Sequence, residues 1–265
     1  MRLYVAGIGL SGPGFSDWVS ALSILRGESA YRPEPYQFSG RSPLAGPERR
    51  RATAMTQLAL EVAMEAAGPD RALWDVPTVF ASSGGEVDTC HVLFDQLARP
   101  ERSVSPTQFH NSVHNAASGY WGIASGSHQP SVSLAGFDTT FAAGLMEAAG
   151  LLREGSREVL LIAYDGPPPF PIGPFRPLVA PFAVAIRLCA ESGRFAQAGL
   201  DIVFDGMASR EPTPMTDPEL EVLRRGNPAA RALPLLAALA RERPATVVLE
   251  FTGSGCLEIE LAPCR

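Results

Sequence analysis

The chain contains no lysine: its 22 cationic residues are all arginine, and 28 acidic residues outnumber them, which gives a formal net charge of −6. A protein that binds nucleic acid needs a basic surface to contact the phosphates. The charge balance therefore argues against a nucleic-acid-binding function, although it leaves a local arginine patch open.

Cysteine is also scarce. Cys90, Cys189, Cys256 and Cys264 are widely spaced, and none belongs to a Cys-x-x-Cys pair. This spacing argues against a zinc site. Four scattered cysteines in a chain of this length are typical of a reduced protein, so we expect a cytoplasmic location.

The sequence has no apolar run that approaches the roughly 18–20 residues needed to span a bilayer. Its first 14 residues, MRLYVAGIGLSGPG, loosely resemble a signal peptide, with one arginine, a short apolar run and a Gly/Pro turn. Because the apolar run is only about seven residues long and no small-x-small site follows it, we predict a buried first strand instead.

With 265 residues, of which 46% are apolar and 19% charged, the chain is long enough to bury a sizeable core. Segments 28–47, 165–181 and 206–218 are rich in Pro, Gly, Ser and Thr and are interpreted as loops. Between them, patterns typical of strands and helices alternate. Because the strand segments are apolar throughout, we predict an α/β fold with a sheet covered on both faces.

The predicted elements follow from apolar runs and helical spacing. Strands are expected over Arg2–Gly9, Pro77–Ser82, Ser131–Ala135, Val159–Tyr164, Phe182–Cys189 and Leu200–Phe204, followed by a hairpin of Thr246–Phe251 and Cys256–Leu261 across Thr252–Gly255. Helices are expected over Ser16–Arg26 (with Ser16 as N-cap), Glu48–Ala67, Glu86–Leu97, Ser112–Ser125, Thr139–Arg153 and Ala229–Arg241. Only a short Pro-rich connection is expected between Phe204 and Ala229.

Two glycine-containing motifs could bind phosphate. Gly7-Ile-Gly9-Leu-Ser-Gly12 loosely matches GxGxxG, but Pro13 and Gly14 follow where a dinucleotide-binding helix should begin. No acidic residue closes a second strand about 20 residues later. We therefore predict no dinucleotide site. The segment Ser82–Gly85 could form a phosphate-binding nest, but a plain turn is favoured.

Cysteine and histidine pairs suggest two further sites. Cys90 and His91 are adjacent, and neighbours on a helix point in different directions, so a catalytic dyad is disfavoured. His110 and His114 have the i,i+4 spacing of a metal site on a helix, but no third ligand is evident. We interpret them as hydrogen-bonded interface histidines.

The segment 105–150, SPTQFHNSVHNAASGYWGIASGSHQPSVSLAGFDTTFAAGLMEAAG, is similar to the ketosynthase branch of the thiolase superfamily. The similarity lies in a Ser-Pro start, an Asn-x-x-x-Gly helix, a Pro-led strand, a sharp turn and a small-residue helix. Segments 48–67, 158–169 and 247–261 also resemble ketosynthase elements. PTVFASSGGE, the SVHNAASG segment and LLIAYDGPPP resemble the short chain-length-factor subfamily, which accompanies aryl-polyene-type fatty acid and polyketide systems.

This resemblance implies a thiolase-like α/β fold with a truncated C-terminal half. Residues 1–190 correspond to the ketosynthase-like N-terminal half. Residues 191–265 correspond to a reduced C-terminal half of a strand, a helix and the terminal hairpin, and we expect both parts to form one compact unit.

Ketosynthases need a cysteine nucleophile at the strand-to-helix turn, because a thiolate accepts the acyl chain from a carrier-protein thioester. Family spacing places that position at Asp138, whose acylation would give a labile mixed anhydride. We expect Asp138 to act as a helix N-cap or turn residue. The four histidines, His91, His110, His114 and His128, lie in the N-terminal half, whereas the family's catalytic histidines belong to the other half. The resemblance therefore implies a catalytically inactive homologue that needs no cofactor.

The family pairs through the strand equivalent to Ser131–Ala135, and an open strand edge needs a cover. The resemblance thus implies a heterodimer with an active ketosynthase, through which this acidic chain meets the acyl carrier protein only indirectly. The segment before the Asn helix would lie beside the partner's acyl pocket, where its bulk would limit chain length. The aromatic residues around the turn have an alternative interpretation as core. The residues assigned to the interface or pocket are Thr107, Gln108, Phe109, His110, Asn115, Ser133, Ala135, Phe137 and Phe141.

Two other functions stay open at this point. Asp138 or Cys90 could serve an acyl-thioester decarboxylase or thioesterase, although no oxyanion donor or base can be assigned. The chain could also be a self-associating structural homologue without a ketosynthase partner.

Overall fold

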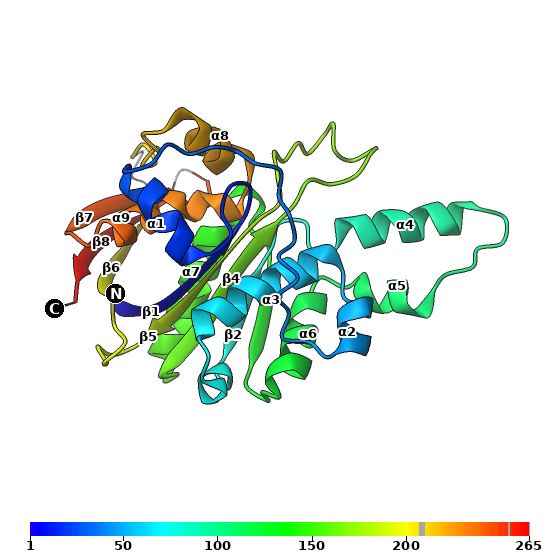
Figure 1. Cartoon of the computed structure of the whole chain (residues 1–265), viewed down its shortest axis with the longest axis horizontal. Helices are drawn as coiled ribbons and strands as arrows, with labels where there is room; N and C mark the ends of the chain where they lie inside the picture. The colour runs from blue at the N-terminus through cyan, green and yellow to red at the C-terminus, as the bar shows by residue number, and fades with distance from the viewer. Residues whose placement is uncertain (207–209, 254, 265) are drawn as a thin grey trace.

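The computed structural model describes residues 1–206, 210–253 and 255–264. They build an eight-stranded mixed sheet with the strand order β3-β2-β4-β5-β1-β6-β8-β7, and helices cover both of its faces (Figure 1). The α/β prediction is confirmed. Within the described residues, no helix has the length and apolar character needed to cross a membrane.

The N-terminal part supplies five of the strands. β3 (Ser131–Leu134), β2 (Thr78–Ala81) and β4 (Glu158–Asp165) run parallel, and their carboxyl ends meet at one edge of the sheet. β5 (Phe182–Cys189) lies antiparallel between β4 and β1 (Arg2–Ser11). Each of these five strands overlaps a predicted strand, and the limits differ by at most two residues.

The tail strands extend this same sheet. β6 (Ala198–Asp205) pairs antiparallel with β1, and β8 (Cys256–Pro263) and β7 (Ala245–Glu250) follow it. β7 and β8 form the predicted hairpin, although Ser254 in its turn lies outside the described residues. The expectation of only a short connection after Phe204 is wrong, because helix α8 (Pro218–Gly226) forms there, capped by Asp217.

Helices cover the two faces in separate groups. α3 (Ala54–Ala67) and α6 (Ala116–Ser125) pack on one face, against side chains such as Leu160 and Ile162. The other face carries α1 (Trp18–Arg26), α7 (Thr140–Arg153) and α9 (Leu233–Ala240). Successive strand residues point to opposite faces, which explains why the apolar strands have no polar alternation. Short 3-10 turns lie at Arg71–Trp74, Phe137–Thr139 and Ala229–Ala232.

Several predicted helix boundaries need correction. The single helix over 48–67 is two helices, α2 (Gly46–Arg51) and α3, because Ala52 and Thr53 are extended and the Thr53 hydroxyl accepts from the backbone N–H of Thr56. The N-cap of α1 is Asp17, not Ser16. The helix expected from Ser112 begins only at Ala116. An additional helix, α5 (Pro106–Asn111), precedes it.

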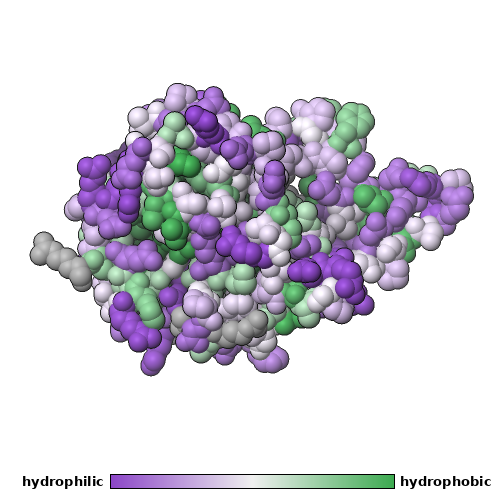
Figure 2. Space-filling model, in the orientation of Figure 1, coloured by the Kyte–Doolittle hydropathy of each residue, from purple (hydrophilic) through white to green (hydrophobic). Residues whose placement is uncertain are grey.

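α4 (Val87–Ala98) and α5 form an arm that projects from the body of the molecule (Figure 1). A hydrogen bond of 2.9 Å from the Gln96 amide to the Gln108 side-chain oxygen joins the two helices. In Figure 2 the arm shows apolar green patches among polar surface. The arm thus presents apolar side chains away from the core.

Candidate functional site: the turns at the carboxyl edge of the parallel strands

The turn after β3 lies where the family resemblance places the nucleophile. Phe137 has φ of 54°, in the left-handed region that non-glycine residues rarely adopt. Two threonine hydroxyls hold this strained turn: Thr139 donates to the carbonyl oxygen of Gly136 (2.8 Å), and Thr140 donates to that of Phe137 (2.7 Å). The backbone N–H of Gly136 in turn donates to the Thr140 hydroxyl (3.0 Å). The turn is therefore closed by its own side chains.

The Asp138 side chain makes an ion pair instead of the expected N-cap interaction. Its Oδ1 accepts from Nη1 of Arg176 at 2.6 Å, while α7 has no side-chain cap. The same guanidinium stacks over the Phe137 ring, 3.9 Å from its centroid, and its Nη2 lies 3.4 Å from the Ser83 hydroxyl. The expected N-cap contact is thus not made, because the carboxylate pairs with a cation from the β4–β5 loop, whereas the alternative expectation of a turn residue agrees with the place of Asp138 in the 3-10 turn Phe137–Thr139.

The neighbouring turn after β2 binds a carboxylate of the chain itself. The backbone N–H groups of Ser83 (2.8 Å) and Gly84 (3.2 Å) and the Ser82 hydroxyl (3.2 Å) donate to Asp165 Oδ1. Asp165 is 2% exposed, and burial raises its pKa to about 6 although these hydrogen bonds lower it. The Ser82–Gly85 segment therefore uses its N–H groups as a nest, but for an internal carboxylate and not for phosphate.

A second buried carboxylate lies just after this turn. Glu86 Oε1 accepts from the hydroxyls of Thr53 and Thr56, each at 2.7 Å. Burial raises its pKa. Because the threonines begin α3 and Glu86 precedes α4, this contact positions the base of the arm against the body.

The histidine pair does not form a metal site. α5 ends at Asn111, so His110 and His114 do not share a helix. His114 Nε2 donates to the carbonyl oxygen of Ser82 at 2.9 Å, and the ring of His110 packs edge-on to Tyr120. Within the ranges that the structure describes, no group of three or more His, Cys, Asp or Glu residues could hold a metal ion.

Cys90 is a partly buried thiol that is held by a hydrogen bond. Its Sγ donates to the carbonyl oxygen of Ser112 at 3.4 Å. Burial, together with the charge of Glu86, raises the pKa of the thiol. A raised pKa reduces the thiolate fraction, so this environment does not favour a nucleophile.

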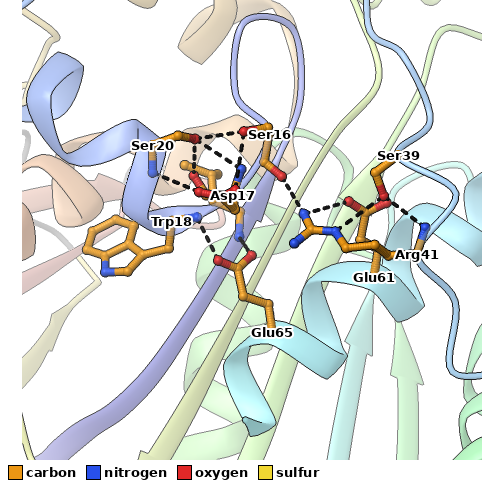
Figure 3. Close-up of polar contacts among 9 residues, drawn as sticks. Ser16, Asp17, Trp18, Ser20, Ser39, Arg41, Glu61 and Glu65 are labelled. Carbon is orange, nitrogen blue, oxygen red and sulfur yellow. Dashed lines mark hydrogen bonds and ion pairs between the residues drawn. The ribbon is translucent and has the colours of Figure 1, made fainter. Parts of the chain in front are cut away.

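Two glycines within the first strand allow close packing. A Cβ atom on Gly7 would lie 2.1 Å from the carbonyl oxygen of Ala66, and one on Gly9 would lie 2.1 Å from that of Val62. These positions let α3 approach β1 closely. Figure 3 shows Glu65 of α3, whose carboxylate accepts from the backbone N–H of Trp18 (2.7 Å), at the start of α1. The Glu65 carboxylate also accepts from the backbone N–H of Leu10 (3.0 Å). A carboxylate of the protein itself therefore binds backbone N–H groups of β1 and α1 around the Gly7–Gly12 region.

The arm carries the first group of residues assigned to the interface. Thr107, Gln108, Phe109 and His110 all lie on α5, and the Phe109 side chain is 68% exposed. It borders an apolar groove of about 520 Å³ between the two helices of the arm. The groove is lined by Cys90, Leu93, Phe94, Leu97, Val104, Pro106, Phe109 and Ser112.

The second group lies around β3. Ser133 is in the edge strand, half-buried, and Ala135 follows it, exposed. Asn115 directly precedes α6, but its side chain makes no capping hydrogen bond. Phe137 is 66% exposed, whereas Phe141 is fully buried in the core. Phe141 thus matches the core interpretation and presents no surface to a partner.

Sequence reasoning missed three residues that organise this edge: Asp165, Arg176 and Asn227. The Asn227 amide donates to the carbonyl oxygens of Asp165 (3.0 Å) and Ala180 (2.8 Å), which begin and end the β4–β5 loop. The position of Asp165 at the end of a strand could have identified it from the sequence, because ligand-binding residues of parallel sheets gather there. Arg176 and Asn227 lie in segments without periodicity, and no sequence pattern identifies them.

Comparison with known proteins gives the family. A family model described as the beta-ketoacyl synthase N-terminal domain matches residues 33–245, most of the chain. The chain belongs to this beta-ketoacyl synthase family. No curated protein matches the sequence.

Solved ketosynthase structures share the fold. A ketosynthase (ApeO) in complex with its chain length factor (ApeC) from Xenorhabdus doucetiae matches at a TM-score of 0.73 and 21% identity, over 98% of this chain and 99% of that chain. The ishigamide ketosynthase/chain length factor matches at 0.72 and 14% identity over both full chains. A type II polyketide synthase acyl-carrier protein in complex with its ketosynthase bound to the hexaketide, AntDE:AntF, matches at 0.70 and 9% identity, with 99% of each chain covered. At these identities the likeness shows the thiolase-like ketosynthase fold.

Proposed function

We propose that this chain is a non-catalytic chain-length factor that pairs with an active beta-ketoacyl-ACP synthase in polyene- or fatty-acid-type biosynthesis. The observation that carries the proposal is the ion pair between Asp138 and Arg176 at the expected nucleophile position. Two of the similar structures contain a chain length factor with its ketosynthase, which supports this assignment.

The chemistry of the turn supports a non-catalytic role. Acyl transfer from a thioester needs a nucleophile whose acyl product is stable enough to carry the chain. A carboxylate forms a mixed anhydride, and its ion pair with Arg176 lowers its nucleophilicity further. His110 and His114 are engaged with Tyr120 and Ser82. These contacts support a structural role for both rings.

The edge of the sheet supports heterodimer formation. β3 forms one edge, and each of its residues is at least partly exposed. In the family that this chain resembles, the equivalent strand joins the sheets of two subunits. Exposed apolar side chains lie on the neighbouring elements: Ile123 on α6, Phe137 in the turn, and Phe94 and Phe109 on the arm. A ketosynthase partner would cover the open edge and these side chains.

The arm gives this subunit a way to set product length. Phe109 is an exposed aromatic residue on α5 of the arm, and the Glu86 contacts fix the base of α4, the other helix of the arm. When the arm reaches the partner's acyl pocket, the Phe109 ring would block its far end sterically. Thr107 and Gln108 on the same helix would line this end. The partner would hold all of the catalysis and the main docking surface for the acyl carrier protein, since this chain carries a net charge of −6.

The test is co-expression with the ketosynthase encoded beside this chain, followed by light scattering. We expect a 1:1 complex, with this chain aggregating or unstable when expressed alone. A well-behaved monomer or homodimer that never binds the ketosynthase would contradict the proposal. A turnover assay of the isolated chain with malonyl and acyl carrier protein provides the second measurement. Hydrolysis that is lost in Asp138→Asn would show a catalytic subunit.

The pocket assignment needs its own comparison in the reconstituted complex. Phe109→Ala should lengthen the products, because it removes the ring at the proposed end of the pocket. Phe94→Ala is the matched control, since it truncates an equally exposed aromatic residue on the facing helix. Product length that is unchanged in Phe109→Ala, or shifted equally in both variants, would remove Phe109 from the role.

A further inference from the structure

The β4–β5 loop, residues 166–181, has no fully buried residue. Every residue in it is at least partly exposed, so no buried side chain anchors it. Its ends are fixed: Asn227 binds the carbonyl oxygens of Asp165 and Ala180, and the backbone N–H of Val179 donates to the carbonyl oxygen of Gly226 at 3.0 Å. No side chain between the two ends is fully buried, so apolar burial, the usual source of loop stability, is limited there.

Among the residues that the structure describes, one side chain makes the polar contacts between the middle of the loop and the body. Among the described residues, Arg176 provides the hydrogen bonds and the ion pair that link segment 167–178 to the rest of the chain. Its guanidinium contacts three groups on two turns: the Asp138 carboxylate, the Phe137 ring and the Ser83 hydroxyl. The guanidinium is mostly shielded, with 23% of the side chain exposed.

We propose that the β4–β5 loop is a strap, and that Arg176 fastens it onto the remnant nucleophile turn through Asp138. Seven of the sixteen loop residues are proline, which lowers the conformational entropy of the released loop and so reduces the free-energy cost of ordering it. The aspartate in the nucleophile position thus has a positive role: it is the anchor point of the strap. The fastened strap lies on the turn and holds Phe170 and Phe175, 79% and 88% exposed, in fixed positions on the surface.

Four backbone N–H groups within the strap form hydrogen bonds that can be followed by amide exchange. The backbone N–H groups of Ile172 and Gly173 donate to the carbonyl oxygen of Pro169, and those of Phe175 and Arg176 donate to that of Ile172. Release of Arg176 would loosen these two internal turns without touching the sheet. Amide hydrogen exchange at these four positions therefore measures whether the strap is fastened.

The experiment compares hydrogen exchange in the wild-type chain with that in Asp138→Ala, Arg176→Ala and the double variant, each in the form in which the wild type is stable. Exchange at the four amides should rise by about threefold to fivefold in each single variant, as expected for one partly shielded ion pair. The double variant should add little, because both substitutions break the same contact. Asp138→Glu, which keeps a carboxylate, should restore much of the protection.

Arg99→Ala is the matched control, because it removes another arginine–aspartate ion pair, with Asp95 on the arm. It should leave the four amides unchanged. The rate of chymotrypsin cleavage after Phe175 is a second measurement. It is best compared between the wild type and Asp138→Ala, because Asp138→Ala leaves the sequence around the cleaved bond unchanged. Faster cleavage supports the strap. Unchanged exchange in Asp138→Ala and Arg176→Ala, or a rise that extends equally to the β5 amides, overturns it. The proposal does not depend on a ketosynthase partner, so its failure would leave the proposed function standing.

Discussion

Two turns at the same edge of the sheet each involve a carboxylate: the turn after β2 binds one in the interior, and the turn after β3 supplies one near the surface. After β2, Asp165 is buried and accepts from two backbone N–H groups and a serine hydroxyl. After β3, Asp138 keeps 41% of its side chain exposed and accepts from a guanidinium on a loop. The donors to Asp165 are mainly backbone N–H groups in a turn whose start is fixed by the sheet. The contact of Asp138 joins two side chains, which can move apart.

The difference contrasts two ways in which a turn at this edge of the sheet can hold a carboxylate in place. Where the sheet supplies the donors, a buried acid becomes part of the fold, and its loss should destabilise the whole molecule. Where a surface cation supplies them, the contact orders only a loop, and its loss should be felt locally. The predictions below test this contrast between global and local effects.

The largest effect is expected for Asp165→Ala. The substitution leaves the N–H groups of Ser83 and Gly84 and the hydroxyl of Ser82 without their buried acceptor, which should cost about 3 kcal/mol. Thermal unfolding should show the melting temperature fall by about 6–10 °C. Asp165→Asn, which keeps an acceptor oxygen, should lose less. A melting temperature unchanged in Asp165→Ala would contradict a structural role for the turn after β2.

Asn227→Ala should cost slightly less, about 2–3 kcal/mol. The Asn227 side chain is buried and makes four hydrogen bonds: its amide donates to Asp165 and Ala180, and its oxygen accepts from the N–H groups of Ala229 and Ala230. Urea unfolding should shift to a lower midpoint as one transition, because these bonds join the tail to the N-terminal part. A separate early transition of the tail would show that the two parts unfold independently.

The pH dependence of stability should carry the signature of Asp165. Burial raises its pKa in the folded state to about 6, above the ordinary value of 3.8. Its stabilising contribution is therefore fully present below pH about 4 and is lost as the pH rises through about 6. Between about pH 4.5 and 7.5, the wild type should lose about 2 kcal/mol relative to Asp165→Asn. A difference that stays constant across this range would show that the carboxyl titrates normally.

Sequence periodicity predicted the sheet well because its strands are buried on both faces. The expected limits of Phe182–Cys189 match β5, and those of the other strands differ from the structure by a few residues. The hydrophobic effect acts on such runs wherever they lie in the chain, so the pattern is readable locally.

Short helices with weak apolar periodicity were missed, although two of them carried a capping signal. Ser105-Pro106 and Asp217-Pro218 place an N-cap type before proline, the typical start of a helix. The break between α2 and α3 is subtler. Thr53 caps α3 and, together with Thr56, binds the distant Glu86, so tertiary contacts favour the break over helix propensity.

The Asp138 position could be found from family spacing, but its partner could not. Arg176 lies 38 residues later in a proline-rich loop. Such a loop has neither strand nor helix periodicity, so the sequence does not indicate where the Arg176 side chain points. Its pairing depends on how Asn227 and Gly226 fix the end of that loop. The sequence therefore predicted that the nucleophile is absent but not what binds in its place.

The smallest effect is expected for Asp138→Asn. The ion pair with Arg176 is partly solvated, and exposed pairs contribute less than about 1 kcal/mol. The amide oxygen can still accept from the guanidinium, and the Thr139 and Thr140 hydroxyls still close the turn. The melting temperature of Asp138→Asn should therefore fall by less than about 2 °C. This decrease is several-fold smaller than the one expected for Asp165→Ala. A loss in Asp138→Asn as large as that in Asp165→Ala would show that both turns stabilise the fold equally, and the contrast between an interior and a surface carboxylate would fail.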